Sequence, residues 1–236
     1  MTSTPRFQYS AAIFERYPTL IGGVIAADHL QNRPSPADFL DLYRAEQQSV
    51  LARIGDTPLS QLPSLAAWRG VFRSFGVDPT QIRSACEALL RRLTKQGDIP
   101  SINLLVDIGN LVSIRYGLPV AIMDTRSAQG TITVKFANGS ESFTNLNAVE
   151  IDHPEAGEVI FADEGDIVYA RRWCWRQSDQ SATREETTTA IITVEGHHDT
   201  ARTDIERAVH DLTALIERFA GGTLTSGLLD ASQRTF

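Results

Sequence analysis

The sequence is poor in cysteine and in positive charge. Its 236 residues include only two cysteines, Cys86 and Cys174, and neither belongs to a CxxC pair. Two such cysteines do not make a disulfide framework, so we expect both to be reduced and to pack as small apolar side chains. Lys and Arg number 22 against 29 Asp and Glu, which gives a formal net charge of -7. This balance argues against a protein that coats nucleic acid non-specifically, because such binding needs many clustered cations.

Long apolar runs and common catalytic motifs are also absent. The run LIGGVIAA is too short to span a bilayer, and the N-terminus carries no basic and apolar leader, so we expect a cytoplasmic protein without a membrane partner. There is no GxxxxGK[ST] loop, no GxGxxG turn and no GxSxG elbow. His197, His198 and Asp199 are adjacent, but no fourth ligand stands at a zinc-like spacing. We therefore predict neither a metal nor another cofactor.

The first half of the chain has mainly helical periodicity. A buried strand is predicted at 17–27 and is followed by helical segments at 35–55, 64–79, 84–100 and 101–119. Ser84 and Glu87 have the spacing of a capping box, and Glu87 and Arg91 have that of an i,i+4 ion pair.

From Pro119 onward the apolar period changes to two. We predict two hairpins and one further strand, formed by residues 130–137 with 141–146, by 157–162 with 167–175, and by 187–196. An amphipathic helix then ends at Gly221 and Gly222. The fold class is α+β, with a mixed or antiparallel sheet flanked by helices in a single domain. Its predicted limits are an N-terminal segment at 1–16, the domain at 17–222 and a mobile tail at 223–236.

The stretch RRWCWR concentrates arginine and tryptophan in six positions. On a strand its alternate side chains would point to opposite faces, and the two sets are Arg171, Trp173 and Trp175, and Arg172, Cys174 and Arg176. Arginine forks bind carboxylate or phosphate, and an indole offers a flat surface to a base or an aromatic ring. Alternatively, the tryptophans fill the core and the arginines form buried ion pairs with Asp107, Glu87 or Glu150.

A polar stripe interrupts the apolar helix predicted at 101–119. Asn103, Asp107 and Asn110 are spaced to share one helix face. Unpartnered amides on such a face would cost about 1 to 3 kcal/mol each, so these side chains need partners. Either they bind loop backbone and are architectural, or they line a pocket.

One block of the sequence carries a resemblance to a known family. Residues 97–124, GDIPSINLLVDIGNLVSIRYGLPVAIMD, resemble the B3/B4 module of bacterial phenylalanyl-tRNA synthetase β subunits and of freestanding B3/B4 proteins. The positions that match this pattern are Gly97, Pro100, Asn103, Val106, Asp107, Asn110, Gly117, Pro119 and Asp124. The likeness continues through Gly130, NGSESFTNL and VIFAD and covers roughly residues 17–222.

The resemblance implies a pocket between two halves of the domain. In the synthetase this module hydrolyses tyrosine wrongly esterified to the phenylalanine tRNA. Position by position, the family's editing glutamate falls on Glu150 and a turn glycine on Gly130. The editing histidine falls on Ala121, and a small-residue segment falls on 170–176. Without that histidine we expect slow hydrolysis that changes little with pH near neutrality.

We therefore predict a freestanding editing-type module that binds the aminoacylated end of a tRNA and hydrolyses a mischarged aminoacyl ester in trans. It would be a deacylase, not a ligase, with Glu150 and Arg172 as its catalytic residues. The predicted substrate-binding residues are Asn103, Asp107, Asn110, Gly130, Arg171, Trp173, Trp175, Arg176, Glu87 and Arg91. The alternative is a non-catalytic protein that binds a free amino acid or a related metabolite in the same pocket. The acyl group, the tRNA and the oligomeric state stay open.

Overall fold

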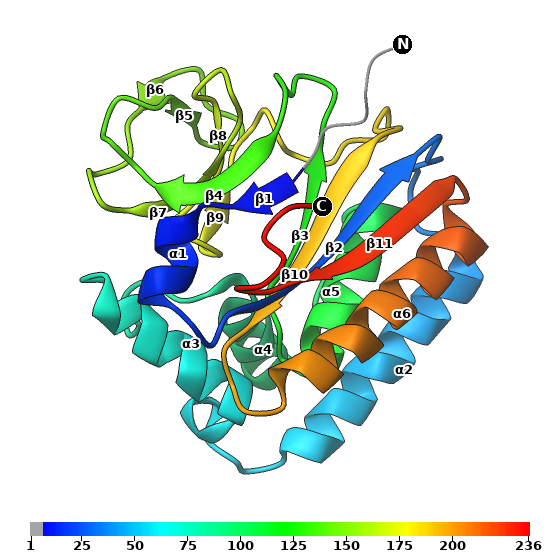
Figure 1. The fold of residues 1–236 in the computed structure, drawn as a ribbon. Coiled ribbons are helices and arrows are strands. Elements are labelled where there is room, and N and C mark those ends of the chain that lie inside the picture. Colours follow the sequence, from blue (N-terminus) through cyan, green and yellow to red (C-terminus); the bar gives the residue numbers. More distant parts are fainter. Residues whose placement is uncertain (1–6) are drawn as a thin grey trace.

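Two larger β-sheets, one two-stranded sheet and a set of helices make up the molecule, which the computed structural model describes over residues 7–236 (Figure 1). Residues 1–6 of the expected N-terminal segment lie outside the described residues. The four-stranded sheet has the order β11-β2-β10-β3, with all neighbours antiparallel. Its strands are β2 (Ile21–Asp28), β3 (Val120–Asp124), β10 (Ala190–Gly196) and β11 (Thr223–Leu229).

The second sheet is mixed, because β1 runs parallel to β4 while the other pairs are antiparallel. Its order is β1-β4-β7-β8-β9. The strands are β1 (Phe7–Tyr9), β4 (Ile132–Phe136), β7 (Val159–Ala162), β8 (Val168–Arg171) and β9 (Arg176–Gln177). Strands β5 (Phe143–Thr144) and β6 (Ile151–Asp152) form a small sheet of their own.

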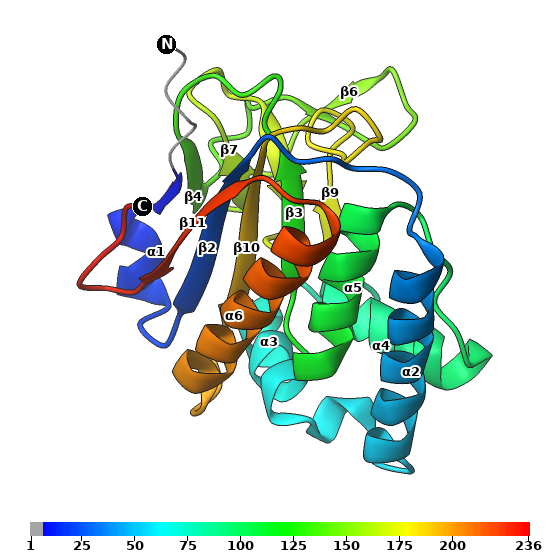
Figure 2. The same ribbon diagram turned by 90° about the vertical axis from the view of Figure 1, so that its right-hand side faces the viewer.

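Helices α5 and α6 lie against one face of the four-stranded sheet, and α2 packs on their outer side (Figure 2). The helices are α1 (Ala11–Arg16), α2 (Ala37–Ile54), α3 (Pro63–Ser74), α4 (Ala85–Gln96), α5 (Leu104–Tyr116) and α6 (Ala201–Phe219), with a short 3-10 turn, η1, at Leu59–Gln61. None of the helices in residues 7–236 is long and apolar enough to cross a bilayer. The expected α+β class, with mixed and antiparallel sheets flanked by helices, is confirmed.

Successive side chains of β10 point to opposite faces of the four-stranded sheet. Ile192 and Val194 face the helices, whereas Ile191 faces a second core that both sheets share. Because successive side chains on a strand point to opposite faces, Thr193 and Glu195 point to the same side as Ile191. The strand that the sequence predicts at 187–196 therefore places the Glu195 carboxylate in the space between the two sheets.

The ends of α4 and the start of α5 depend on side-chain and glycine caps. Ser84 Oγ accepts a hydrogen bond from the Glu87 N–H at 3.4 Å, and Gly97 ends α4 with a φ of 84°, as the sequence predicts. Asn103 Oδ1 accepts from the Val106 N–H at 3.1 Å. Asn103 is thus the N-cap of α5 and not a member of its polar face.

One predicted strand pairing is wrong, and the expected mobile tail contains a strand. Strand β4 does not pair with residues 141–146, because β1 and β7 occupy both of its edges. The Glu141 carboxylate accepts the N–H groups of Asn138 and Gly139 at 3.1 Å and closes the turn after β4. Residues 223–236, which we expected to be a mobile tail, begin with β11, which pairs with β2 along all of its length. Residues 7–16 likewise belong to the fold, as β1 and α1.

The predicted strand at 167–175 ends early. The hairpin of β7 and β8 is confirmed, but β8 stops at Arg171 and residues 172–175 form a turn that leads into β9. Arg172 and Trp173 have φ values of 45° and 62°, in the left-handed region. The Trp173 N–H donates to the Val159 carbonyl at 2.7 Å, which fixes the turn against β7. The predicted alternation of arginine and tryptophan across two strand faces is therefore wrong.

Candidate functional site

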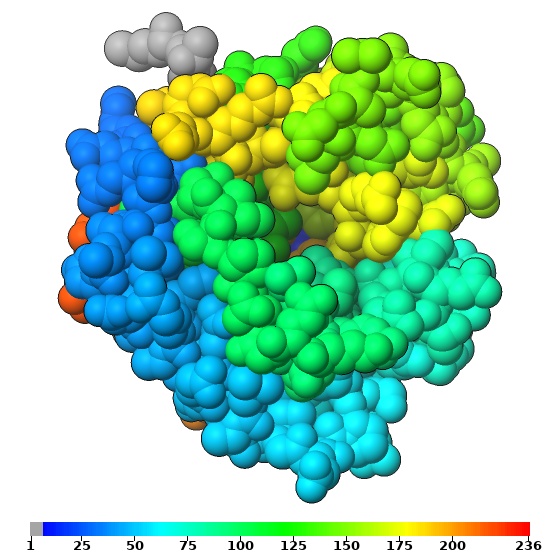
Figure 3. Space-filling view, turned by 180° about the vertical axis from the view of Figure 1, so that it is seen from behind, coloured from blue at the N-terminus to red at the C-terminus, as the bar shows by residue number. Residues whose placement is uncertain are grey.

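A cleft separates α4 and α5 from the segment 174–177. Figure 3 shows it as the hollow between the green helical segment and the yellow segment on the opposite wall. Its outer part has a volume of about 440 Å³. Polar groups on its wall include Asn110, Gln177, Thr183 and Arg92.

An inner cavity of about 60 Å³ adjoins the outer cleft, and Trp175 and Gln177 line both. Ala121, Thr193 and Glu195 of the four-stranded sheet form one wall, where Ala121 and Thr193 are ladder partners on β3 and β10. The opposite wall consists of Phe161, Ala170, Trp173 and Cys174. A space of this size accommodates a few water molecules or one small chemical group.

Glu195 is the carboxylate of the inner cavity. The Tyr9 hydroxyl donates to its Oε1 at 2.8 Å, and Trp173 Nε1 donates to the same oxygen at 3.0 Å. Burial raises the pKa of Glu195 to about 7, while these two hydrogen bonds act in the opposite direction. Both protonation states are therefore populated at neutral pH, as suits a general acid or base.

A glycine opposite Glu195 makes this arrangement possible. Gly22 on β2 is the ladder partner of Glu195. A Cβ atom at Gly22 would lie 2.3 Å from the Tyr9 hydroxyl oxygen, far inside contact distance. Only a residue without a side chain lets Tyr9 reach across β2 to the carboxylate.

Trp175 forms the border between the inner cavity and the outer cleft. The guanidinium carbons of Arg172 and Arg176 lie 4.8 and 4.4 Å from its ring centroid. Arg176 also donates to Asn145 Oδ1 at 3.0 Å. Within residues 7–236, neither these two arginines nor Arg92 takes part in an ion pair, so their positive charges remain available to a ligand.

Four of the predicted binding residues lie at this cleft: Asn110, Trp173, Trp175 and Arg176. Trp173 is fully buried, and its ring packs edge-on against Trp68 with 5.3 Å between centroids. Ala121, the position on which the resemblance places a histidine, lines the same cavity. The α5 helix and the RRWCWR segment thus line the same cleft.

Other predicted site residues lie elsewhere. Glu150 is exposed on the loop before β6 and does not line the cleft. Arg172 lines a different cavity. Arg171 is buried and forms ion pairs with Glu158, at 2.9 Å, and with Asp152. The alternative of buried ion pairs thus holds for Arg171, but with partners other than those predicted.

The remaining candidates have structural contacts. The fully buried Asp107 accepts from the Ser35 hydroxyl at 2.6 Å and from the Ile102 N–H at 2.9 Å, which holds the loops at the start of α5. The Asn103 amide donates to the Thr183 carbonyl at 3.1 Å. These two residues therefore follow the architectural alternative, and only Asn110 of the polar stripe reaches the cleft.

Three further predicted residues do not line the cleft. The expected Glu87–Arg91 ion pair is wrong, because Glu87 pairs with Arg69 on α3, while Arg91 is exposed. Gly130 lies in the turn before β4 with a φ of 69°, packed over the Glu164 carboxylate.

Sequence reasoning missed Glu195, Thr193 and Gln177. A signal was present for Glu195, because a lone carboxylate at the end of the apolar run AIITVE needs a buried partner or a function. Its partner Tyr9 could not be identified, since the two residues are 186 positions apart.

The sequence is similar to one domain family and to subunits of one tRNA ligase. Residues 67–235 match the sequence profile of the B3/4 domain family. The phenylalanine–tRNA ligase β subunit of Streptomyces avermitilis is 32% identical over 161 residues, which are 68% of this chain and 19% of that protein. The corresponding subunit of Shewanella oneidensis is 29% identical over 94 residues, which are 40% of this chain and 12% of that protein.

The chain thus spans less than a fifth of the length of these relatives. Among solved structures, an N-terminal fragment of the phenylalanyl-tRNA synthetase β subunit from Pyrococcus horikoshii is similar over 92% of this chain and 49% of that chain. The sequence identity is 11% and the TM-score is 0.47.

Proposed function

The chain belongs to the B3/4 domain family, and from this premise we propose that its cleft binds the aminoacylated end of a tRNA and hydrolyses the aminoacyl ester in trans. The observation that carries the proposal is the position of Glu195. It supplies a buried carboxylate, with a pKa of about 7, at the inner end of a cleft that opens to solvent.

The charge distribution around the cleft supports a nucleic-acid end as the ligand. The two basic segments of the sequence, LLRRLTK and RRWCWR, are far apart in the chain and meet here through Arg92 and Arg176. Unpaired arginines bind phosphate, and the indole of Trp175, which lines the same cleft, is a surface on which a base can stack. Because the whole chain is acidic, RNA binding would depend on these few contacts and would weaken only moderately with salt.

Hydrolysis requires a base for water and an acid for the leaving oxygen. In the proposed reaction the Glu195 carboxylate accepts a proton from water while the water oxygen bonds to the ester carbonyl carbon. The tetrahedral intermediate then releases the ribose oxygen, which receives the proton from Glu195. The products are a free amino acid and a tRNA with a free terminal hydroxyl. Tyr9 and Trp173 both hold Oε1, which leaves Oε2 for the water.

The size of the inner cavity indicates the class of acyl group. About 60 Å³ fits a side chain such as that of alanine or serine, but not an aromatic ring. Trp173 and Trp175 occupy positions where the resemblance places small residues, so the cavity beside Ala121 is narrow. We therefore propose small aminoacyl esters as the substrates.

The test is deacylation of a panel of tRNAs that carry small or aromatic amino acids. General acid–base groups contribute about 10² to 10⁴ in rate, so Glu195→Gln should lose at least about a hundredfold of the hydrolysis rate. Glu150→Gln is the matched control, because Glu150 is the glutamate that the sequence predicts to be catalytic and it does not line the cleft. Equal loss in both variants, or full activity in Glu195→Gln, contradicts the assignment of Glu195.

The same panel separates hydrolysis from binding. If wild-type protein releases no amino acid from any tRNA, the catalytic part of the proposal is wrong. Saturable binding of a free amino acid that Arg176→Ala weakens and Arg172→Gly does not would then support the non-catalytic alternative, because Arg176 lines the cleft and Arg172 does not.

A further inference from the structure

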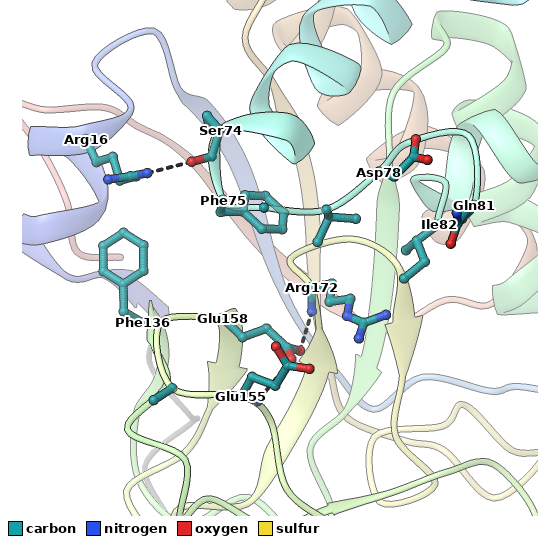
Figure 4. Close-up of a pocket in the computed structure, with 14 residues that line it drawn as sticks. Arg16, Ser74, Phe75, Asp78, Gln81, Ile82, Phe136, Glu155, Glu158 and Arg172 are labelled. Carbon is teal, nitrogen blue, oxygen red and sulfur yellow. Dashed lines mark hydrogen bonds between the residues drawn. The ribbon is translucent and has the colours of Figure 1, made fainter.

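A second cavity lies on the other side of the turn 172–175 (Figure 4). It has a volume of about 730 Å³, within the range of roughly 300 to 1,000 Å³ that is typical of small-molecule sites. Its walls come from the end of α1, from residues 74–82 after α3 and from the loop 155–158. It shares no lining residue with the cleft.

Part of this cavity is apolar. Figure 4 shows the Phe75 ring on the side of the 74–82 segment and the Phe136 ring at one end of the cavity. Val77 and Ile82 add aliphatic surface, and all four side chains are only partly buried. An apolar ligand group would remove this surface from water.

Most charged groups on the wall already have partners. Arg16 donates to the Ser74 carbonyl at 2.6 Å, and Asp78 accepts from the Thr80 N–H at 2.8 Å. Glu158 accepts from Arg171 Nη2 at 2.9 Å and from the Arg172 N–H at 2.9 Å. These groups are satisfied within the protein.

The charged groups of Arg172 and Glu155 have no such partner among the described residues. Within residues 7–236, the Arg172 guanidinium makes no hydrogen bond or ion pair and only packs on the Trp175 ring, at 4.8 Å. The Glu155 carboxylate is exposed and has no ion pair in the same part of the chain. Figure 4 shows both side chains on the side of the cavity that lies across from residues 74–82.

The backbone at Arg172 is held in an unfavourable conformation. Its φ of 45° lies in the left-handed region, which a residue with a Cβ atom seldom adopts. The Glu158 carboxylate fixes this conformation by accepting the Arg172 N–H. Strained residues of this kind concentrate at functional sites, and here the strain places a free cation on the wall of a cavity.

We propose that this second cavity binds a free α-amino acid with an apolar side chain. The ligand carboxylate pairs with the Arg172 guanidinium, the ligand ammonium pairs with Glu155, and the side chain packs against Phe75 and Phe136. A ligand with one charge would satisfy only one of the two free groups, whereas a zwitterion satisfies both. This site is separate from the cleft and does not depend on the activity proposed there.

The site is physically connected to the cleft. Arg172 lines the second cavity, and the Trp175 ring on which it packs lines both parts of the cleft. A carboxylate that binds the guanidinium changes its contact with this ring. Occupation of the cavity is therefore expected to change the fluorescence of Trp175, and this change should be absent from Trp175→Phe.

The test is calorimetric titration with leucine and phenylalanine, together with phenylpropionate and phenethylamine, which lack the ammonium and the carboxylate respectively. The zwitterions should bind at least tenfold more tightly than either analogue of phenylalanine. Arg172→Gly and Glu155→Gln should each weaken binding of the zwitterions at least tenfold. Glycine suits the backbone at position 172, so this variant removes the side chain without adding strain.

Two matched controls locate the ligand. Arg176→Ala removes the other arginine on Trp175, and Glu150→Gln neutralises an exposed carboxylate that does not line the second cavity. Both variants should bind the zwitterions as wild type does. The proposal is overturned if neither zwitterion binds at millimolar concentration, or if either analogue binds as tightly as phenylalanine. It is also overturned if Arg176→Ala weakens binding while Arg172→Gly does not, because the ligand then occupies the cleft.

Discussion

The Trp173 indole donates its N–H to the Glu195 carboxylate at 3.0 Å. The same indole packs edge-on against the His197 imidazole, with 5.3 Å between ring centroids. Burial raises the pKa of Glu195 to about 7. Burial, with a smaller contribution from His198, lowers the pKa of His197 to about 3. Two ionisable groups at the end of β10 are thus both held toward their neutral forms, with opposite consequences for the pH dependence of stability.

The two residues act against each other in weakly acidic solution. Between pH 4.5 and about 7 the folded protein keeps a proton on Glu195 that the unfolded chain releases, so this contribution to stability is lost as pH rises. Between pH 6.5 and about 3 the unfolded chain gains a proton on His197 that the folded protein excludes, so stability is lost as pH falls. In the shared window the two slopes oppose each other.

The first prediction concerns Glu195→Gln, which keeps an oxygen acceptor for Tyr9 and Trp173 but does not titrate. Relative to wild type, its stability should fall by up to about 1.4 kcal/mol per pH unit between pH 6.5 and 4.5, because the slope from His197 is no longer opposed. From pH 4.5 to 7 the variant should gain roughly 3 kcal/mol relative to wild type, and above pH 7 this difference should stay constant, since the wild type then buries a carboxylate and the variant does not. Urea unfolding followed by circular dichroism from pH 4.5 to 8 measures both effects. Parallel profiles for the two proteins would contradict the raised pKa.

The second prediction removes the His197 imidazole and leaves Glu195 as the group that titrates. His197→Phe keeps an aromatic ring beside Trp68, whose ring centroid lies 4.7 Å from that of His197, and removes the titrating group. Its stability should decrease as pH rises from 5 to 7, because the slope from Glu195 remains alone. Thermal unfolding at closely spaced pH values tests this. The double variant with Glu195→Gln is the control and should have a flatter profile than either single variant.

The third prediction concerns the pH dependence of hydrolysis. Ala121 in place of histidine predicts hydrolysis that is nearly independent of pH around neutrality, but Glu195 lines the same cavity as Ala121. If the carboxylate is the base, the deacylation rate should rise with pH through an apparent pKa near 7, and Glu195→Gln should show no such step. Rates from pH 5.5 to 8.5 on one aminoacyl-tRNA decide between the two. A flat wild-type profile would rule out this role.

The sequence predicts most of the fold, because its elements have strong local signals. Ser84 and Gly97 limit α4 as predicted, and β10 and α6 occupy their predicted places. The resemblance to the B3/4 family, carried by residues 97–124, is confirmed by the match over residues 67–235.

The site is less predictable, since it depends on contacts between distant residues. The Tyr9 hydroxyl reaches the Glu195 carboxylate across the space that Gly22 leaves open and donates a hydrogen bond to it. No local sequence pattern predicts this contact. The sequence does not predict the turn at Arg172 and Trp173 either, because two consecutive residues with side chains rarely adopt positive φ values.

The fourth prediction compares two tryptophans that are two residues apart. Trp173 is fully buried and packs against Trp68, Tyr17 and His197, so Trp173→Ala should cost about 3 to 5 kcal/mol of unfolding free energy. Trp175 is half-buried at the border of the cleft, so Trp175→Ala should cost about 1 kcal/mol while changing ligand binding. Denaturant unfolding of both variants tests the contrast. Similar losses in the two would mean that Trp175 is a core residue and not a wall of the site.

The last prediction concerns β11, which the sequence presents as a tail. Its ladder with β2 runs from Thr223, opposite Asp28, to Leu229, opposite Gly22. Leu229 is fully buried in the core that the two sheets share. Removal of residues 223–236 would expose the hydrogen-bonding edge of β2 and open this core next to Gly22 and Tyr9.

We therefore expect the chain truncated after Gly222 to be unfolded or aggregated at 25 °C, as judged by circular dichroism and size-exclusion chromatography. In the full chain, Leu229→Ala should cost about 2 to 5 kcal/mol, because it leaves a cavity in the shared core. Thr225→Ala changes an exposed residue of the same strand and should stay within about 0.5 kcal/mol of wild type. A soluble truncated protein with wild-type stability would mean that β11 contributes nothing to the fold, and that the boundary of the folded domain lies at residue 222 after all.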